Sequence, residues 1–227
     1  YGGLLATLDA VNQAGFVHTG VGTNLDEAAA PAYLDTANGR VALISAVSTM
    51  MNVAAMAGQQ SRRVPGRPGV NGLRIDETIV VTPEQLATIQ EIVALSSVNA
   101  KDDISRAEGY TLPVPEGQVA LKELRFQQGN ETRYHTKPNK VDMDRVEKAI
   151  YEAQMNADLI LVSIHSHEVS GTSKENPSEF LVEFAHRCID AGAHAVIGHG
   201  PHLLRPIEIY KSCPIFYSLG DFVLHTE

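Results

Sequence analysis

The sequence has little cysteine and no excess of basic residues. Its two cysteines, Cys188 and Cys213, form neither a metal-binding spacing nor a disulfide framework. Lysine and arginine number 18 against 27 acidic residues, which gives a formal net charge of −9 without a block of basic residues. Because nucleic-acid binding depends on basic side chains that neutralise phosphates, we expect no nucleic-acid partner.

Long apolar runs are also lacking. No stretch of about 18 consecutive apolar residues occurs, so no membrane span is expected, and no signal-peptide pattern is visible. The chain opens with Tyr1 and not with an initiator methionine, so the sequence does not choose between the cell surface and the cytoplasm. Residues 1–227 are expected to form a single domain, long enough to bury a core without structural metal.

Apolar spacing and capping residues predict four helices. They are residues 4–11 followed by Gly15, a helix begun by Thr82-Pro83-Glu84-Gln85, one capped by Asp142, and one from 176–179 to Gly192. Apolar runs predict strands at residues 41–47, 119–126, 159–164, 195–197, 207–210 and 215–219, of which 41–47 and 159–164 are expected to be buried on both faces. Loops are expected at residues 16–24, 57–76, 99–118 and 127–140.

The order of these elements predicts the fold class. A strand, a helix and a second strand follow one another between residues 159 and 197, which indicates a crossover and parallel pairing. The predicted fold is therefore α/β, a layered sheet flanked by helices.

Four histidines follow two of the predicted strands. His165 and His167 come directly after strand 159–164, and His199 and His202 come directly after strand 195–197. The carboxyl ends of parallel strands meet at one edge of a sheet, where neighbouring strands lie about 4.8 Å apart. The pattern therefore favours a metal site at the carboxyl ends of the strands, although a histidine at a strand end is also commonly an ordinary hydrogen-bonded residue.

The remaining histidines do not share this placement. His18, His135, His186 and His194 are predicted to be structural or surface residues, and no role is assigned to His225.

Three other polar residues lie close to the histidine pairs in the sequence. Glu168 follows the first pair and Asp221 follows the last strand, where each could hold the ring N–H of a ligand or be solvated. Arg205 lies three residues after His202, where a guanidinium could bind a carboxylate or phosphate or simply lie at the surface.

Several motifs together resemble one known family. They are Gly198-His199-Gly200-Pro201-His202-Leu203-Leu204-Arg205, Ile207-Glu208-Ile209-Tyr210-Lys211, Pro214-Ile215-Phe216-Tyr217-Ser218-Leu219-Gly220-Asp221-Phe222, the upstream His165-Ser166-His167-Glu168, and Arg67-Pro68-Gly69-Val70-Asn71-Gly72-Leu73-Arg74. The set resembles CapA proteins, the poly-γ-glutamate capsule-synthesis family of the bacterial calcineurin-like metallophosphoesterase superfamily. The resemblance covers nearly the whole chain and implies a metallophosphoesterase-like fold.

The chain departs from the family pattern at three places. Asp221 stands where the family has asparagine, and Ser166-His167 stand where many members have Trp-Gly. The opening Tyr1-Gly2 is similar to the end of the family motif Asn-Asn-His-x-x-Asp-Tyr-Gly. The resemblance therefore implies that early ligands, including a bridging carboxylate, lie upstream of Tyr1, and that this N-terminal segment is a partner of the site.

The resemblance also implies roles for the site residues. His165, His199 and His202 would be ligands of divalent metal, two ions in the family, for which manganese, zinc and iron all suit imidazole-rich sites. His167 is the candidate general acid or base, and Glu168 and Asp221 complete the catalytic candidates. Arg205 is assigned to substrate binding.

Three functions are compatible with this site. The preferred reading is a metal-dependent hydrolase of phosphoesterase type linked to capsule or poly-γ-glutamate synthesis. The first alternative is a metal-dependent peptide epimerase that acts by proton transfer. The second is a non-catalytic capsule-assembly component that binds acidic polymer. The expected substrates are accordingly an acidic polymer, a peptide or a phosphoester.

Overall fold

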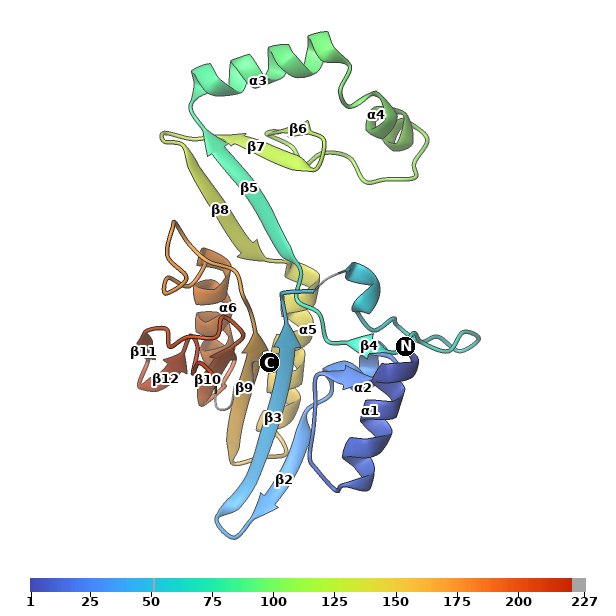
Figure 1. Ribbon diagram of the computed structural model, residues 1–227, viewed down its shortest axis with the longest axis vertical. Helices are drawn as coiled ribbons and strands as arrows, with labels where there is room; N and C mark the ends of the chain where they lie inside the picture. Colours follow the sequence, from blue (N-terminus) through green and yellow to red (C-terminus); the bar gives the residue numbers. More distant parts are fainter. Residues whose placement is uncertain (51, 222–227) are drawn as a thin grey trace, which may run out of the picture. The chain divides into compact units, whose positions relative to one another are not determined.

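A computed structural model describes residues 1–50 and 52–221 (Figure 1). The chain divides into two compact units, of which the first contains Tyr1–Ile75 and the residues from Pro138 onwards. The second unit, Asp76–Lys137, is inserted between these two segments. The expected single domain over residues 1–227 stays a prediction. Within the described part of the chain, no helix is both long and apolar enough to cross a membrane.

The first unit contains a six-stranded sheet in the order β11-β12-β10-β9-β3-β2. Its strands are β2 (Ala32–Thr36), β3 (Gly39–Val47), β9 (Leu159–His165), β10 (Ala195–His199), β11 (Ile207–Tyr210) and β12 (Cys213–Phe216). The four central strands run parallel, and both edge strands are antiparallel to their neighbours. The predicted crossover is confirmed, because β9 and β10 are adjacent and are connected through α6 (Glu179–Asp190).

One face of this sheet is buried under α5 (Lys140–Gln154) and α6. Every second side chain of β3 and β9, such as Ile44 and Ile164, packs there against helix residues such as Ile150 and Phe184. Burial of each such large apolar side chain contributes about 1.5–3 kcal/mol. The expectation that β3 and β9 are buried on both faces is wrong for the described chain, since the intervening residues are half-buried.

The other elements of the first unit lie outside this six-stranded sheet. They are α1 (Gly2–Gln13), β1 (Val21–Gly22), α2 (Leu25–Ala29), the 3-10 helix η1 (Val53–Ala55) and β4 (Gly69–Val70), which pairs with β1. The predicted surface loop over residues 57–76 is wrong near Leu73, which is fully buried. The reason is tertiary: the Leu73 N–H donates to the Val47 carbonyl at 2.8 Å, and Asn71 Nδ2 donates to the Ser45 carbonyl at 2.8 Å.

Asp142 does not cap α5, contrary to the prediction. Asn139 is the residue before the helix, and Asp142 lies in the first turn with a fully buried side chain. Its carboxylate accepts hydrogen bonds from Arg74 Nε at 2.7 Å and from Arg145 Nη1 at 2.9 Å. Arg74 is distant in the sequence, so a local capping pattern could not reveal this ion pair.

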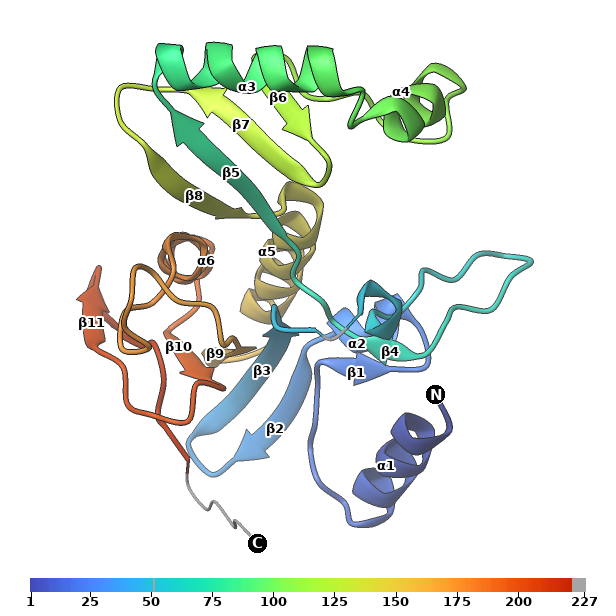
Figure 2. The same cartoon turned by 45° about the horizontal axis from the view of Figure 1, so that its top comes forward.

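The second unit is a four-stranded sheet in the order β6-β7-β5-β8 with two helices (Figure 2). Its elements are β5 (Ile75–Val81), α3 (Pro83–Ser96), α4 (Ala100–Ala107), β6 (Gln118–Leu121), β7 (Leu124–Gln128) and β8 (Arg133–Pro138). The helix begun by Thr82 is confirmed, and its capping box with Gln85 is formed.

Three expectations for the second unit are wrong. The loop expected at 99–118 contains α4, and the loop expected at 127–140 contains β8. The single strand expected at 119–126 is a hairpin of β6 and β7, which turns at Lys122 with a φ of 56°. Because a left-handed lysine carries no glycine or asparagine signal, the turn is not visible in the sequence. Taken together, the chain is a mixed α/β protein with sheets flanked by helices, consistent with a calcineurin-like fold.

Candidate functional site

The four histidines predicted to share a site form a row at the carboxyl ends of β9 and β10. His165 and His199 are register partners on the adjacent strands, and their Nδ1 atoms lie 3.1 Å apart. His167 Nε2 lies 3.1 Å from His165 Nε2 on the other side. The ring of His202 follows, with its centroid 5.3 Å from that of His167. We call His199, His165, His167 and His202, in this order, the histidine row.

Backbone geometry at the strand ends explains this convergence. The Ser166 N–H donates to the His199 carbonyl at 2.9 Å, so the β9–β10 pairing continues one residue past the site. Gly200 has a φ of 125°, which lets the chain turn sharply after β10. A Cβ on Gly198 would lie 2.5 Å from the Tyr217 carbonyl oxygen, so only glycine permits the close approach of this segment. The parallel register and two glycines therefore bring both histidine loops together.

The environment favours neutral imidazoles at His165 and His199. Burial lowers the pKa of His165, and the neighbouring His199 and His167 rings lower it further. Burial also lowers the pKa of His199. Because a neutral imidazole is the form that binds a metal cation, these shifts favour the ligand form of His165 and His199 at neutral pH.

The contacts of His165 decide how far the row fits a metal ion. Two nitrogens bound to one ion at about 2.0–2.1 Å lie roughly 3.3 Å apart at a tetrahedral angle, close to the 3.1 Å observed in either pair. However, His165 uses Nδ1 toward His199 and Nε2 toward His167, so the three rings do not converge on one point. Over residues 1–50 and 52–221, no three His, Cys, Asp or Glu side chains are arranged as a metal-ligand group. The imidazole nitrogens of the row could thus supply two ligands to an ion, but not a complete ligand shell.

Glu168 connects the row to the end of β3. Its Oε2 atom accepts hydrogen bonds from the hydroxyls of Ser48 at 2.8 Å, Thr49 at 2.9 Å and Ser166 at 2.9 Å. Thr49 Oγ1 in turn accepts from the His167 N–H at 2.7 Å. Sequence reasoning missed Ser48 and Thr49, although both follow the predicted strand 41–47 and the strand-end argument applied to the histidines would have found them.

Asp221 lies next to His202. The sequence left open whether Asp221 holds the ring N–H of a ligand or is solvated, and the structure places it against the His202 ring. His202 Nδ1 and Asp221 Oδ1 are 2.9 Å apart, and His202 adopts a left-handed φ of 61°. A carboxylate on Nδ1 fixes the proton there and leaves the Nε2 lone pair for a ligand.

Arg205 lies inside the protein, with 4% of its surface exposed. Its Nη2 donates to the Glu168 carbonyl and its Nε to the Lys174 carbonyl, both at 2.9 Å. Among the described residues the buried Nη1 has no hydrogen-bond partner. Burial lowers the pKa of this guanidinium, an effect that Glu168 opposes. These hydrogen bonds hold the loop after His167 in place. Substrate binding by Arg205 stays a prediction.

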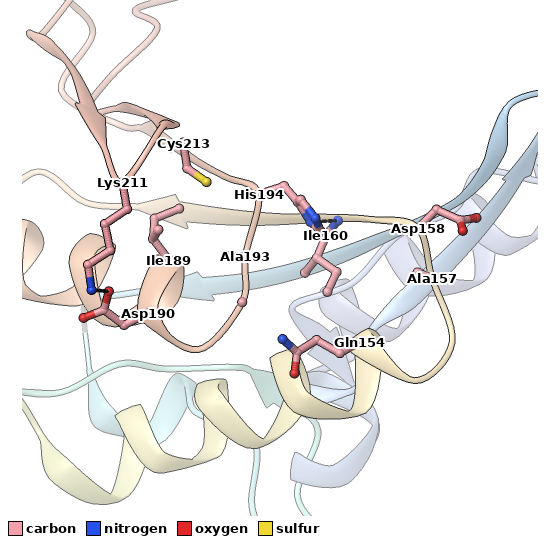
Figure 3. Close-up of a pocket in the computed structure, with 11 residues that line it drawn as sticks. Gln154, Ala157, Asp158, Ile160, Ile189, Asp190, Ala193, His194, Lys211 and Cys213 are labelled. Carbon is pink, nitrogen blue, oxygen red and sulfur yellow. Dashed lines mark hydrogen bonds and ion pairs between the residues drawn. The ribbon is translucent and has the colours of Figure 1, made fainter.

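A separate pocket of about 640 Å³ lies at the amino ends of the same strands (Figure 3). Lys211 Nζ donates to Asp190 Oδ1 at 2.6 Å there, and the Ile160 N–H donates to His194 Nδ1 at 3.0 Å. The structural role predicted for His194 is therefore confirmed. Since polar groups of this pocket already bind one another, and none of the predicted site residues lines it, we place the candidate site at the histidine row.

Comparisons with known proteins extend these observations. The family model described as "Bacterial capsule synthesis protein PGA_cap" matches residues 1–226. The chain is 35% identical over 221 residues to the uncharacterized protein y4sH of Sinorhizobium fredii, covering 97% of this chain and 45% of that protein. It is 43% identical over 75 residues to the PGA biosynthesis protein CapA of Bacillus subtilis, covering 33% of this chain and 19% of that protein.

A third relative, also a CapA protein, matches about a third of this chain. The capsule biosynthesis protein CapA of Bacillus anthracis is 38% identical over 81 residues, which cover 36% of this chain and 19% of that protein. The match to y4sH includes almost all residues of this chain, but this chain spans less than half the length of y4sH.

Proposed function

Because the chain belongs to the bacterial capsule synthesis protein family PGA_cap, which is associated with capsule and poly-γ-glutamate synthesis, we propose that it is a metal-dependent hydrolase of phosphoesterase type acting in that process. The observation that supports this proposal most is the histidine row at the carboxyl ends of two adjacent parallel strands. Imidazole nitrogens that lie 3.1 Å apart at a strand edge suit the binding of a cation.

The proposal assigns a role to each side chain. His165, His199 and His202 hold the divalent metal, with manganese, zinc or iron as suitable ions. A bound metal would supply a Lewis acid that lowers the pKa of a water molecule toward neutrality. His167 takes or gives the proton at its ring nitrogen, and Asp221 orients His202. Glu168 fixes His167 through Thr49, and Arg205 orders the loop that follows.

The described residues offer pairs of donors, so further ligands are needed for two ions. We propose that parts of the full-length protein outside residues 1–227 complete the ligand shell. Residues 1–227 alone should then bind at most one manganese ion weakly, whereas a longer protein of the length of y4sH should bind two and gain activity. Calorimetric titration of both forms measures this, and two tight sites in the shorter form would contradict it.

A peptide epimerase is the second candidate, and one observation favours it. The hydrogen-bonded rings of His199, His165 and His167 can pass a proton along the row, which suits removal and return of a Cα proton. Deuterium incorporation from D2O into a γ-glutamyl peptide, without hydrolysis of phosphoesters, would select this reaction over the first.

Metal content provides the direct test of the site. His165→Ala and His199→Ala should each lose bound metal, measured by elemental analysis of the purified protein, and should retain the circular dichroism spectrum of the wild type. His194→Ala is the matched control, because it removes an imidazole from the other end of β10. Equal metal in all three variants would overturn the assignment.

A further inference from the structure

A polar pocket of about 580 Å³ lies within the second unit. Its lining includes three nitrogen-bearing side chains of β8, namely Arg133, His135 and Lys137. Gln118 of β6 and Gln127 of β7 contribute amides, and Glu131 contributes a carboxylate at the turn before β8. The pocket contains no member of the histidine row, so neither the sequence analysis nor the proposed reaction accounts for it.

The β8 side chains line the pocket because of strand periodicity. Alternate residues of a strand point to the same face and are separated by about 6.7 Å along it. Of the residues on the opposite side, Thr136 and the following Pro138 are buried, whereas Tyr134 is 55% exposed. β8 therefore presents Arg133, His135 and Lys137 as an evenly spaced basic stripe, although the second unit as a whole has more acidic than basic residues.

The pocket opens on the sheet face that α3 leaves uncovered. Gln118 and Gln127 are register partners, and Gln127 is also the register partner of Val80, so these lining residues share one face. α3 packs along β6 and β7, as Figure 2 shows, while the pocket walls consist of strand and turn residues. A ligand can therefore lie along the strands without displacing a helix.

The chemistry of the pocket selects an anionic, hydrogen-bonding ligand. Arginine and lysine bind carboxylates by charge-assisted hydrogen bonds, and glutamine amides donate to and accept from peptide groups. A repeating carboxylate chain offers both kinds of partner, one after another, to an evenly spaced basic stripe. We propose that this pocket binds a segment of a poly-γ-glutamate-like acidic polymer, an inference that rests on the capsule-related role proposed above.

A simpler explanation exists for the same residues. β8 is an edge strand of its sheet, and proteins often place lysine and arginine on edge strands to prevent aggregation. That role needs no pocket, no glutamine side chains on neighbouring strands and no particular ligand. The two explanations therefore differ in a measurable property, the affinity for the polymer.

Calorimetric titration of a γ-linked glutamate oligomer into the full chain tests the proposal. The wild type should bind, and affinity should fall about threefold to tenfold for Arg133→Gln or Lys137→Gln and further for the double variant. Lys101→Gln on α4 is the matched control, with the same change of charge in the same unit, and should shift affinity by less than about twofold. A γ-linked glutamine oligomer should bind far more weakly than the glutamate oligomer.

The outcomes also separate this proposal from the metal-dependent function. A chelator, His165→Ala and His199→Ala should leave polymer affinity unchanged while they remove metal. Failure of the metal test with intact polymer binding would therefore overturn only the proposed reaction. No binding by the wild type would overturn the pocket proposal, as would binding lost in His165→Ala but retained in the Arg133→Gln/Lys137→Gln variant.

Discussion

The two units of this chain place their polar side chains in opposite ways. In the first unit, the inner strands β9 and β10 are mostly apolar and the polar groups follow at their ends, where His165 and His199 meet. In the second unit, polar groups run along a strand face, as Arg133 and Lys137 do on β8. Inner parallel strands that are mostly apolar leave their ends for chemistry, whereas the edge strand β8 carries polar side chains along its length.

Core truncation should show the largest difference between the units. Phe184 is fully buried between α6 and the sheet, so Phe184→Ala should lower the free energy of unfolding by about 3–5 kcal/mol. Leu86, on α3 of the second unit, is 8% exposed, and Leu86→Ala should cost near the lower end of about 2–5 kcal/mol. Urea unfolding with hydrogen exchange read separately for each unit checks this. Equal losses would break the comparison.

Loss of the buried Asp142 carboxylate in the first unit should have the second-largest effect on stability. Asp142→Asn leaves Arg74 and Arg145 without their carboxylate and should cost about 3 kcal/mol. Burial raises the pKa of Asp142, but hydrogen bonds from Arg74 and Arg145 outweigh it, so the pKa is lowered overall. The stabilisation is therefore present above the unfolded pKa of about 3.9 and is lost as pH falls below it through the folded value.

Thermal unfolding between pH 6 and pH 2 measures this dependence. The wild type should lose more stability than Asp142→Asn over the acid range. Asp35→Asn is the control, because Asp35 pairs with Arg40 at the exposed surface and its loss should leave unfolding almost unchanged. An identical acid dependence in the wild type and Asp142→Asn would show that another carboxylate dominates.

Arg205 should affect the loop beside the site more than the whole fold. Arg205→Met removes the hydrogen bonds to the Glu168 and Lys174 carbonyls but keeps much of the buried volume. We expect a loss of about 1–3 kcal/mol and faster amide exchange within residues 168–176. If exchange there is unchanged while an anionic substrate binds more weakly, Arg205 contacts substrate directly, as the sequence predicted.

Asp221 should have the smallest effect on the fold and a distinct effect on the site. Asp221→Ala removes the partner of His202 Nδ1 and should weaken metal binding about tenfold. Asp221→Asn keeps an acceptor oxygen but removes the charge, so it should lower the Michaelis constant for an anionic substrate. Unchanged metal affinity and kinetics in both variants would show that the His202 contact has no function.

Much of the first unit could be predicted from the sequence, because its signals are local. Apolar runs give β3, β9 and β10, and the crossover rule places His165 beside His199. The second unit could not be predicted as well, since β8 has only six residues, begins with two exposed ones and ends in a proline, a composition that resembles a loop. The contact of Asp142 with Arg74 joins residues far apart in the sequence, and no local pattern reveals it. The position of Ser48 after strand 41–47 could have placed it at the site, but not its hydrogen bond to Glu168.

The double use of His165 has a consequence for the order of the ring protons. A neutral imidazole carries one proton, so each ring that bonds on both sides must donate on one side and accept on the other. His199 Nε2 also faces the Ser163 hydroxyl at 3.1 Å, so Ser163, His199, His165 and His167 can be aligned in only two directions. A cation between the two Nδ1 atoms needs both lone pairs, which forces the His165 proton onto Nε2. A neutral His165 that binds an ion through Nδ1 therefore has no lone pair left on Nε2 for a second ion.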